Sequence, residues 1–223
     1  MASIKSNQLP TLNEVYNRLF GKLGPQHWWP AKGKFEVMVG AILTQATNWK
    51  NVEKAIRNLK KERVLSAQAI AKNSPRNIEK LILPAGYFRQ KTKCLKFFCS
   101  WFLTRYNANT KKMFRQDTAI LRRSLLGIKG IGPETADSIL LYAGDKPTFV
   151  VDAYTRRIFY RHYLAEDNAS YSEIQSFALR NLPERPSLLN EFHALLVAVG
   201  KKYCHKGVPY CDGCPLEQFP HKS

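Results

Sequence analysis

Apolar residues recur at helical spacing along almost the whole chain. In residues 12–23 they return at every third or fourth position, which predicts one buried face of a helix. Residues 35–43 are apolar nearly throughout, which predicts a helix buried on all sides. The same reasoning predicts helices over 47–60, 66–72, 74–83, 89–106, 117–126, 135–142, 152–163, 172–181 and 187–202. Strand-like alternation does not recur, and residues 149–151 are too short to establish a sheet, so we expect an all-α fold.

The charge of the chain indicates that this helical protein binds polyanions. There are 35 Lys and Arg against 17 Asp and Glu, a formal net charge of +18. Such a balance favours nucleic acid as a partner, although it would suit ribosomal or chromatin proteins equally. A disordered basic tail is excluded, because 44% of the residues are apolar and 12% aromatic. Residues 1–10 contain no apolar run typical of a signal peptide, and we expect no membrane partner.

One segment, residues 126–152, carries the most specific pattern. It reads LGIKGIGPETADSILLYAGDKPTFVVD, with a Gly130-Ile131-Gly132 turn between two helical patterns. Pro133 suits the first position of the following helix, and glycines allow the turn to take positive φ. Backbone N–H groups at such a turn can cradle an anionic group, for which phosphate is the obvious candidate in a basic chain. Asp152 then opens a third helix and supplies a carboxylate.

The five cysteines fall into two groups. Cys94 and Cys99 lie in an aromatic stretch, CLKFFCSWF, and are expected to be buried thiols. Cys204, Cys211 and Cys214 lie within eleven residues of one another near the C-terminus. This spacing favours a metal or iron–sulfur cluster over a disulfide, with three unligated loop cysteines as the alternative. A fourth ligand is open: His205, His221 or a group from outside the chain.

Together these motifs resemble the helix-hairpin-helix (HhH-GPD) DNA glycosylases of the endonuclease III superfamily. LLGIKGIGPETAD, the acid in VVDAYTRRI, the helix FHALLVAVGKKYC and the three cysteines stand in that family's order. The WWP element before KFEVMVGAILTQATNWKNVEKAI further resembles the 3-methyladenine DNA glycosylase III-type branch. The resemblance implies a monomer of two helical lobes with a DNA cleft between them. Residues 35–148 would form a barrel with the hairpin, and 1–34 with 149–223 a second lobe with the cysteine loop 204–214.

The resemblance also assigns roles at the DNA. Asp152 matches the catalytic aspartate, whose carboxylate stabilises positive charge on the sugar as the glycosidic bond breaks. It could equally act as a helix N-cap, worth about 1 kcal/mol, and both roles are compatible. Gly130, Ile131 and Gly132, with the adjacent Lys129, match the phosphate-binding turn. Gln45 and Tyr87 match side chains that enter the duplex beside an extruded base, or are plain surface residues.

Glu134 is the most informative departure from the family pattern. Members that also cut the DNA backbone carry a lysine at this position, whose amine forms a Schiff base with the sugar. A carboxylate cannot perform that step, so the sequence favours a monofunctional glycosylase that activates water. Glu134 could simply be an acid at a helix start, which the helix dipole favours.

Three tryptophans suggest the substrate. Trp28, Trp29 and Trp49 match aromatic positions of the base pocket in the 3-methyladenine branch. An N-alkylated purine is cationic, and an indole face attracts it by about 2 kcal/mol when desolvated. Filling the core is the usual fate of tryptophan, and adjacent Trp28 and Trp29 cannot readily face the same way, so at least one should be structural.

The cysteine loop departs from the family pattern as well. The resemblance implies a 4Fe–4S cluster whose fourth cysteine would fall near position 220, where this chain has Pro220. The 3-methyladenine branch lacks the cluster, so the fourth ligand is His221 or none. A cluster here would be structural and would order Lys201, Lys202 and Lys206 against DNA phosphates.

The sequence therefore predicts a base excision repair glycosylase acting on a damaged base, an alkylated purine in the first instance, flipped out of double-stranded DNA. The alternatives are an endonuclease III-like glycosylase and AP lyase for oxidised pyrimidines, and a non-catalytic protein that binds DNA structure. In a prokaryotic source such a protein would be cytoplasmic, with the nucleoid.

Overall fold

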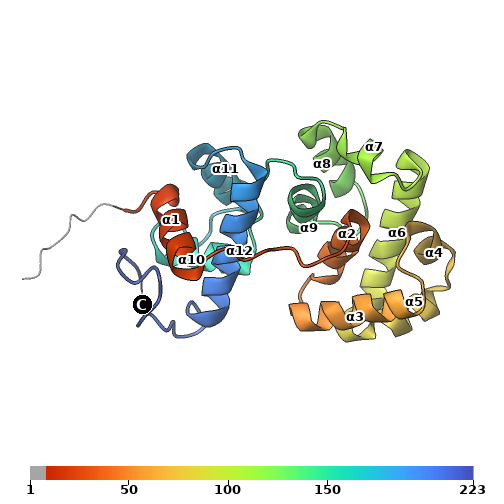
Figure 1. The fold of residues 1–223 in the computed structure, drawn as a ribbon, viewed down its shortest axis with the longest axis horizontal. Helices are drawn as coiled ribbons and strands as arrows, with labels where there is room; N and C mark the ends of the chain where they lie inside the picture. Colours follow the sequence, from red (N-terminus) through yellow and green to blue (C-terminus); the bar gives the residue numbers. More distant parts are fainter. Residues whose placement is uncertain (1–8, 223) are drawn as a thin grey trace, which may run out of the picture. The chain divides into compact units, whose positions relative to one another are not determined.

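The computed structural model describes residues 9–222, and every regular element within them is helical (Figure 1). The prediction of an all-α fold is confirmed for this part of the chain. The residues divide into two compact units, Trp29–Lys146 and a second that joins residues up to Trp28 with those from Pro147. No described helix is both long enough and apolar enough to cross a bilayer. Residues 1–8 and 223, which the expected second lobe includes, lie outside the described residues.

The first unit is here called the barrel unit, and its helices are given in chain order. They are α2 (Lys34–Leu43), α3 (Trp49–Lys61), α4 (Ala67–Lys72), α5 (Pro75–Ile82), the 3₁₀ turn η1 (Leu83–Ala85), α6 (Phe88–Tyr106), α7 (Thr110–Phe114), α8 (Thr118–Leu126), α9 (Pro133–Ser138) and the π-helical turn η2 (Ile139–Ala143). The terminal unit contains α1 (Leu12–Leu23), α10 (Ala153–Arg161), α11 (Tyr171–Asn181) and α12 (Pro186–Lys202).

Polar caps explain why many of these helices begin where they do. Thr11 and Ser170 each form a capping box with the glutamate three residues later, at α1 and α11. Ser66, Ser74 and Asp117 accept hydrogen bonds from the first turns of α4, α5 and α8. Each cap satisfies an N–H that the helix itself leaves unpaired. Helix starts were therefore predictable from the sequence to within one or two residues.

The core of the barrel unit is built around α2 and α6. Every residue from Val37 to Leu43 is buried, as the continuous apolar run predicts. On α6 the predicted apolar face is also buried, with the rings of Phe98 and Phe102 stacked at 5.9 Å. The helices α4 and α5 both pack against α6, and α2 packs against η2.

The barrel unit starts earlier than the 35–148 that the resemblance implies, because Trp29 belongs to its packing. The Trp29 ring lies against Gly40 of α2, where a Cβ would stand 3.1 Å from the ring atom Cζ2. It also meets the rings of Trp49 and Tyr142, with centroid distances of 5.0 and 5.1 Å. The preceding tryptophan, Trp28, belongs to the terminal unit.

Two local features differ from the expected helices. The short helix α7 was not expected, and residues 135–142 form α9 and then η2 instead of one α-helix. The π-helical turn ends where the N–H of Gly144 reaches the carbonyls of Ile139 and Leu140. A Cβ on Gly144 would lie 2.6 Å from the Leu140 oxygen, so this close approach requires glycine. The wider turn carries Tyr142, whose ring meets Trp29.

In the terminal unit, α10 packs tightly along α12. The closest approach is at Gly200, where a Cβ would lie 2.3 Å from the ring of Tyr154. Phe149 and Phe192 fill the adjoining core with rings 5.9 Å apart. Because α10 and α12 pack closely, the first residue before α10 lies within reach of a side chain on α12.

Candidate functional site

The hairpin between α8 and α9 has the expected turn. The N–H of Ile131 donates to the carbonyl of Ile128 at 3.0 Å, and Gly130 has a φ of +94°. A Cβ on Gly130 would lie 3.0 Å from Cβ of Cys94, so both the conformation and the close packing on α6 require glycine here. Gly132 is the N-cap of α9 and Pro133 its first residue, as the sequence predicts.

An ion pair with a buried carboxylate holds the two helices of the hairpin together. The guanidinium of Arg122 on α8 donates to both carboxylate oxygens of Asp137 on α9, at 2.8 and 2.9 Å. The Asp137 side chain is 0% exposed. Such a two-pronged pair fixes the geometry of the turn, because it restrains the helix on either side of it. This pair could not be identified from the sequence, because Asp137 stands in the quoted motif whereas Arg122 precedes it by three residues.

Gln45 lies against the hairpin. Its amide nitrogen donates to the carbonyl of Gly130 and to the hydroxyl of Thr135, both at 2.9 Å. The segment after α2 and the hairpin turn are thus joined by one side chain. A role for Gln45 inside the duplex would require these two hydrogen bonds to be exchanged for contacts with DNA.

Tyr87 is presented to solvent. Its side chain is 66% exposed, and its backbone takes the left-handed conformation, with a φ of +44°, immediately before α6. Leu83, in the same short segment, is 55% exposed. Two large exposed apolar side chains so close together suit insertion between bases. Leu83 escaped the sequence analysis because it closes an ordinary helical pattern.

Glu134 and Lys129 both lie on the surface of the hairpin. Glu134 stands in the first turn of α9, where an acid interacts favourably with the helix dipole. The position that would carry a nucleophilic lysine therefore holds an exposed carboxylate.

Asp152 caps α10 and keeps one carboxylate oxygen for another partner. Its Oδ1 accepts the N–H of Thr155 at 2.8 Å, and its Oδ2 lies 3.5 Å from Nε2 of His193. The side chain is only 15% exposed. Burial by itself raises the pKa of Asp152, but the imidazole of His193 and the bonds from Thr155 outweigh it, so the pKa lies below its ordinary value. The carboxylate is thus ionised at neutral pH in a largely dry setting.

His193 is the residue beside the acid that the sequence analysis did not single out. It is buried on α12, between Phe192 and Ala194. A histidine in an apolar helix is usually a satisfied core residue, so the pattern alone carried no signal. Only the packing of α10 on α12 brings it to Asp152.

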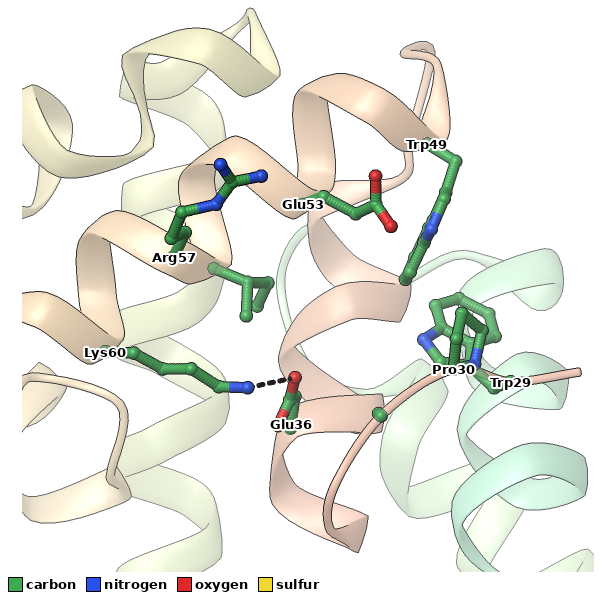
Figure 2. A pocket seen from close by; sticks show the side chains of 9 residues that line it. Trp29, Pro30, Glu36, Trp49, Glu53, Arg57 and Lys60 are labelled. Atoms are coloured by element: carbon green, nitrogen blue, oxygen red, sulfur yellow. Dashed lines mark hydrogen bonds and ion pairs between the residues drawn. The ribbon is translucent and has the colours of Figure 1, made fainter.

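Trp29 and Trp49 line a pocket in the barrel unit. Their rings lie perpendicular, and the cavity of about 260 Å³ is also lined by Glu36, Glu53, Arg57 and Lys60. Figure 2 shows the two indoles at one end and the carboxylate of Glu53 turned towards them from α3. At the other end Lys60 donates to Glu36 at 2.6 Å. Glu53 was not predicted, because one acid on an amphipathic helix is ordinarily a solvated surface residue.

Trp28 has a different setting in the terminal unit. The ammonium of Lys201, near the end of α12, lies 5.9 Å from the centre of its ring. The three predicted pocket residues are therefore divided between the two units, two in the barrel unit and one in the terminal unit.

The predicted cysteine ligands line one small cavity. Cys204, Cys211 and Cys214 share it with His162 and His221, whereas His205 is exposed. Arg161 donates to the sulfur of Cys204 at 3.2 Å and to two loop carbonyls, those of His205 and Gly207. Among the described residues, no three His, Cys, Asp or Glu side chains converge to hold a single metal ion. A four-iron cluster does not require such convergence, because each ligand binds a separate iron.

His221 has the hydrogen bonding of a metal-ligating histidine. Its Nδ1 lies 2.8 Å from the carbonyl of Phe219. If Nδ1 donates this bond, Nε2 is the nitrogen with a lone pair to offer. Thiolates and imidazole are the ligands that iron–sulfur clusters use, so the residues of this cavity fit such a cluster chemically.

Comparison with known proteins identifies the family. The family model described as "HhH-GPD superfamily base excision DNA repair protein" matches residues 39–184. The chain belongs to the HhH-GPD superfamily. The expectation drawn from the hairpin, Asp152 and the cysteine loop is thus confirmed at the level of the family.

This HhH-GPD protein is similar to one curated relative over nearly its full length. Protein MJ1434 of Methanocaldococcus jannaschii, whose name gives a provisional assignment as a DNA repair glycosylase, is 45% identical over 97% of this chain and 98% of its own. Among solved structures, 3-methyladenine DNA glycosylase (MagIII) of H. pylori bound to 1,N6-ethenoadenine has a TM-score of 0.76. It is 28% identical, over 86% of this chain and 98% of that one.

A non-covalent endonuclease III–DNA complex shares the fold. Its TM-score is 0.81 over 95% of this chain and 96% of that one, at 18% identity. The endonuclease III-like helical fold is therefore confirmed.

Proposed function

We propose that this protein is a monofunctional DNA glycosylase that hydrolyses the N-glycosidic bond of a damaged base extruded from duplex DNA. The observation that carries the proposal is the ionised, largely buried carboxylate of Asp152. As the C1′–N bond breaks, its electron pair leaves with the base and positive charge develops on the sugar. Asp152 stabilises that charge and orients a water molecule, whose oxygen bonds to C1′. The proton of that water passes to solvent when the base was cationic, or to the departing base when it was neutral. The products are the free base and an abasic site.

Replacing Asp152 tests the reaction. In Asp152→Asn the amide keeps the size of the side chain but loses the negative charge, so we expect base release to fall by at least about a hundredfold. DNA binding should stay within about twofold, because one charge is a small part of the electrostatic total. Single-turnover base release and gel-shift affinity measure the two effects. Undiminished release by Asp152→Asn would remove the acid from its role.

Glu134 supports hydrolysis without strand cleavage. A Schiff base requires an amine, and the exposed carboxylate of Glu134 occupies the position where lyases carry a lysine. We expect no covalent adduct when the protein is mixed with damaged DNA and sodium borohydride. The variant Glu134→Lys is the informative companion, because gain of a trapped adduct would show that the position is aligned with the sugar. Trapping by the unaltered protein would instead favour the bifunctional glycosylase and lyase.

For the lesion, we propose an N-alkylated purine. Two perpendicular indoles and the Glu53 carboxylate line one pocket, which offers a cationic base aromatic surface and a negative charge. Alkylation also weakens the glycosidic bond, so no strong general acid is needed. The similarity to a 3-methyladenine DNA glycosylase bound to 1,N6-ethenoadenine is in keeping with this substrate class.

A panel of duplexes tests the lesion. Oligonucleotides with alkylated purines, uracil, 8-oxoguanine or an oxidised pyrimidine should be incubated separately, and the released base quantified. We expect the alkylated purines to be released fastest, and Glu53→Gln to slow cationic lesions more than neutral ones. Preferential release of uracil or an oxidised base would overturn the alkyl-purine assignment while retaining the glycosylase. No release from any duplex would favour the non-catalytic DNA binder.

We further propose that Cys204, Cys211 and Cys214 hold an iron–sulfur cluster with His221 as the fourth ligand. The shared cavity and the hydrogen bond of His221 to Phe219 support this ligand set. Protein purified without oxygen should contain iron and absorb broadly in the visible range. His221→Ala should lose or shift that absorbance, and His205→Ala, which changes an exposed neighbour, should not. If protein purified in this way contains no iron and is nevertheless fully stable, the proposal is wrong.

A further inference from the structure

Lys91 is a buried lysine that the proposed chemistry does not use. It lies near the start of α6 and is 2% exposed. Its ammonium donates to the carbonyls of Leu43 at 2.9 Å and of Ala85 at 2.7 Å. Burial lowers its pKa to about 8, so at neutral pH the group is still charged.

A charge in this position is costly, because an ammonium leaves water for a largely apolar core. A leucine or methionine would fill the space at no such cost. Both partners of Lys91 are helix-end carbonyls, which the helices themselves leave unpaired. The arrangement therefore joins two helix ends that are distant in sequence.

The two carbonyls stand at equivalent places before the predicted DNA-inserting residues. Leu43 ends α2 and precedes Gln45 by two residues, and Ala85 ends η1 and precedes Tyr87 by two residues. The ammonium of Lys91 thus holds the starts of both segments, the one that leads to Gln45 and the one that leads to Tyr87. The exposed Tyr87 and Leu83 extend from one of them, and Gln45 from the other.

The same helix also supports the hairpin. One turn beyond Lys91, the side chain of Cys94 packs against Gly130, and Gln45 donates to the carbonyl of that glycine. The Gln45 segment, the Tyr87 segment and the hairpin are therefore anchored on the first two turns of α6 and on one another. A displacement at Lys91 would reach all of them.

We propose that Lys91 is a positioning residue that locks the Gln45 and Tyr87 segments together so that they enter the duplex as one unit. The inference rests on the proposed function, since it assumes that these segments open the DNA. Lys91 itself touches neither base nor sugar. Its contribution is the fixed separation of the two segments, without which each would have to be ordered separately at the DNA.

The chain offers a closely matched control on the same helix. Lys96 is partly buried and donates to the carbonyls of Ile70, Ala71 and Asn73 at the end of α4. It performs the same kind of capping, but for a helix that carries none of the inserting side chains. Lys96→Met therefore reproduces the loss of a capping ammonium without disturbing the Gln45 and Tyr87 segments.

The experiment compares Lys91→Met with Lys96→Met in the full-length protein. A duplex carrying 2-aminopurine beside an alkylated purine reports unstacking by fluorescence, and single-turnover base release is measured on the same duplex. We expect Lys91→Met to reduce both the fluorescence gain and the release rate by about tenfold or more, since small misplacements near a reacting centre cost up to two orders of magnitude. Affinity for undamaged duplex should be unchanged. Lys96→Met, with a comparable loss of thermal stability, should retain both signals.

Tyr87→Ala and Gln45→Ala distinguish the positioning role of Lys91 from the inserting roles of Tyr87 and Gln45. If they lose the fluorescence gain and Lys91→Met keeps it, the positioning role is wrong although the inserting role stands. If none of the three variants changes the signal, the positioning role falls together with the inserting roles. Because unstacking is measured without bond cleavage, failure of base release from every lesion would overturn the proposed function alone.

Discussion

At the scale of single residues, Asp152 is governed by two opposing effects. Burial disfavours its negative charge, and the imidazole of His193 with the bonds from Thr155 favours it. The second effect is larger, so the pKa lies below the ordinary value. Since the folded pKa is lowered, the ionised acid stabilises the fold above its unfolded pKa, and this stabilisation is lost as the pH falls through the folded value.

This balance predicts the pH dependence of base release. For the unaltered protein, the acid limb should lie below the ordinary aspartate pKa of about 3.9. In His193→Phe the burial remains and the favourable partner is gone, so the pKa of Asp152 rises and the acid limb moves to higher pH. Measured from pH 4 to 8, single-turnover release should show no acid limb for the unaltered protein or the exposed His205→Phe control, and an acid limb for His193→Phe. An acid limb that stays in place would show that His193 does not set the ionisation.

The same scale shows the limits of motif reading. Gly130 could be identified from sequence because its positive φ demands glycine, and Asp152 because an acid at the start of a helix is a common N-cap. Gln45 could be identified too, but its hydrogen bonds to the hairpin could not, because its two partners are 85 and 90 residues away. His193 and Glu53 gave no sequence signal at all, since each is an ordinary residue of its helix face.

At the scale of elements, the hairpin depends on the ion pair between α8 and α9. A surface salt bridge contributes little, but Asp137 is fully buried and receives both bonds from one guanidinium. Removing the arginine would leave a buried carboxylate without its cation. The turn and its N–H groups are held by helices that this pair clamps, so their geometry depends on it.

We expect Arg122→Met to destabilise the protein by roughly 3 kcal/mol, the scale of removing one partner of an ion pair whose carboxylate is buried. Arg123→Met removes the same charge from an exposed position of α8 and should change stability by less than about 0.5 kcal/mol. Denaturant unfolding of both variants measures the difference. Equal small effects would mean that the pair does not hold the hairpin.

At the scale of the whole molecule, charge dominates the encounter with DNA. The net charge of +18 gives the protein affinity for any duplex, before a damaged base is recognised. This affinity comes from release of counterions, so it is independent of Asp152, the acid proposed to perform the reaction.

Affinity for undamaged duplex should therefore fall by about a thousandfold or more between 50 and 200 mM salt, as expected for a protein that neutralises several phosphates. The Asp152→Asn variant should give the same slope of log affinity against log salt concentration. Fluorescence anisotropy over a salt series measures both. A shallow slope would show that the positive charge is directed away from the DNA.

The sequence by itself determined most of the helices, though not α7 or the π-helical turn η2, and also the caps, the hairpin turn and the family, because each depends on residues a few positions apart. It also placed an acid where a lyase carries lysine. Only the tertiary structure decided which side chains meet: His193 with Asp152, Gln45 with Gly130, and Lys91 with the ends of α2 and η1. These contacts arise from helices packing across long stretches of chain, and no local pattern encodes which helix faces will touch.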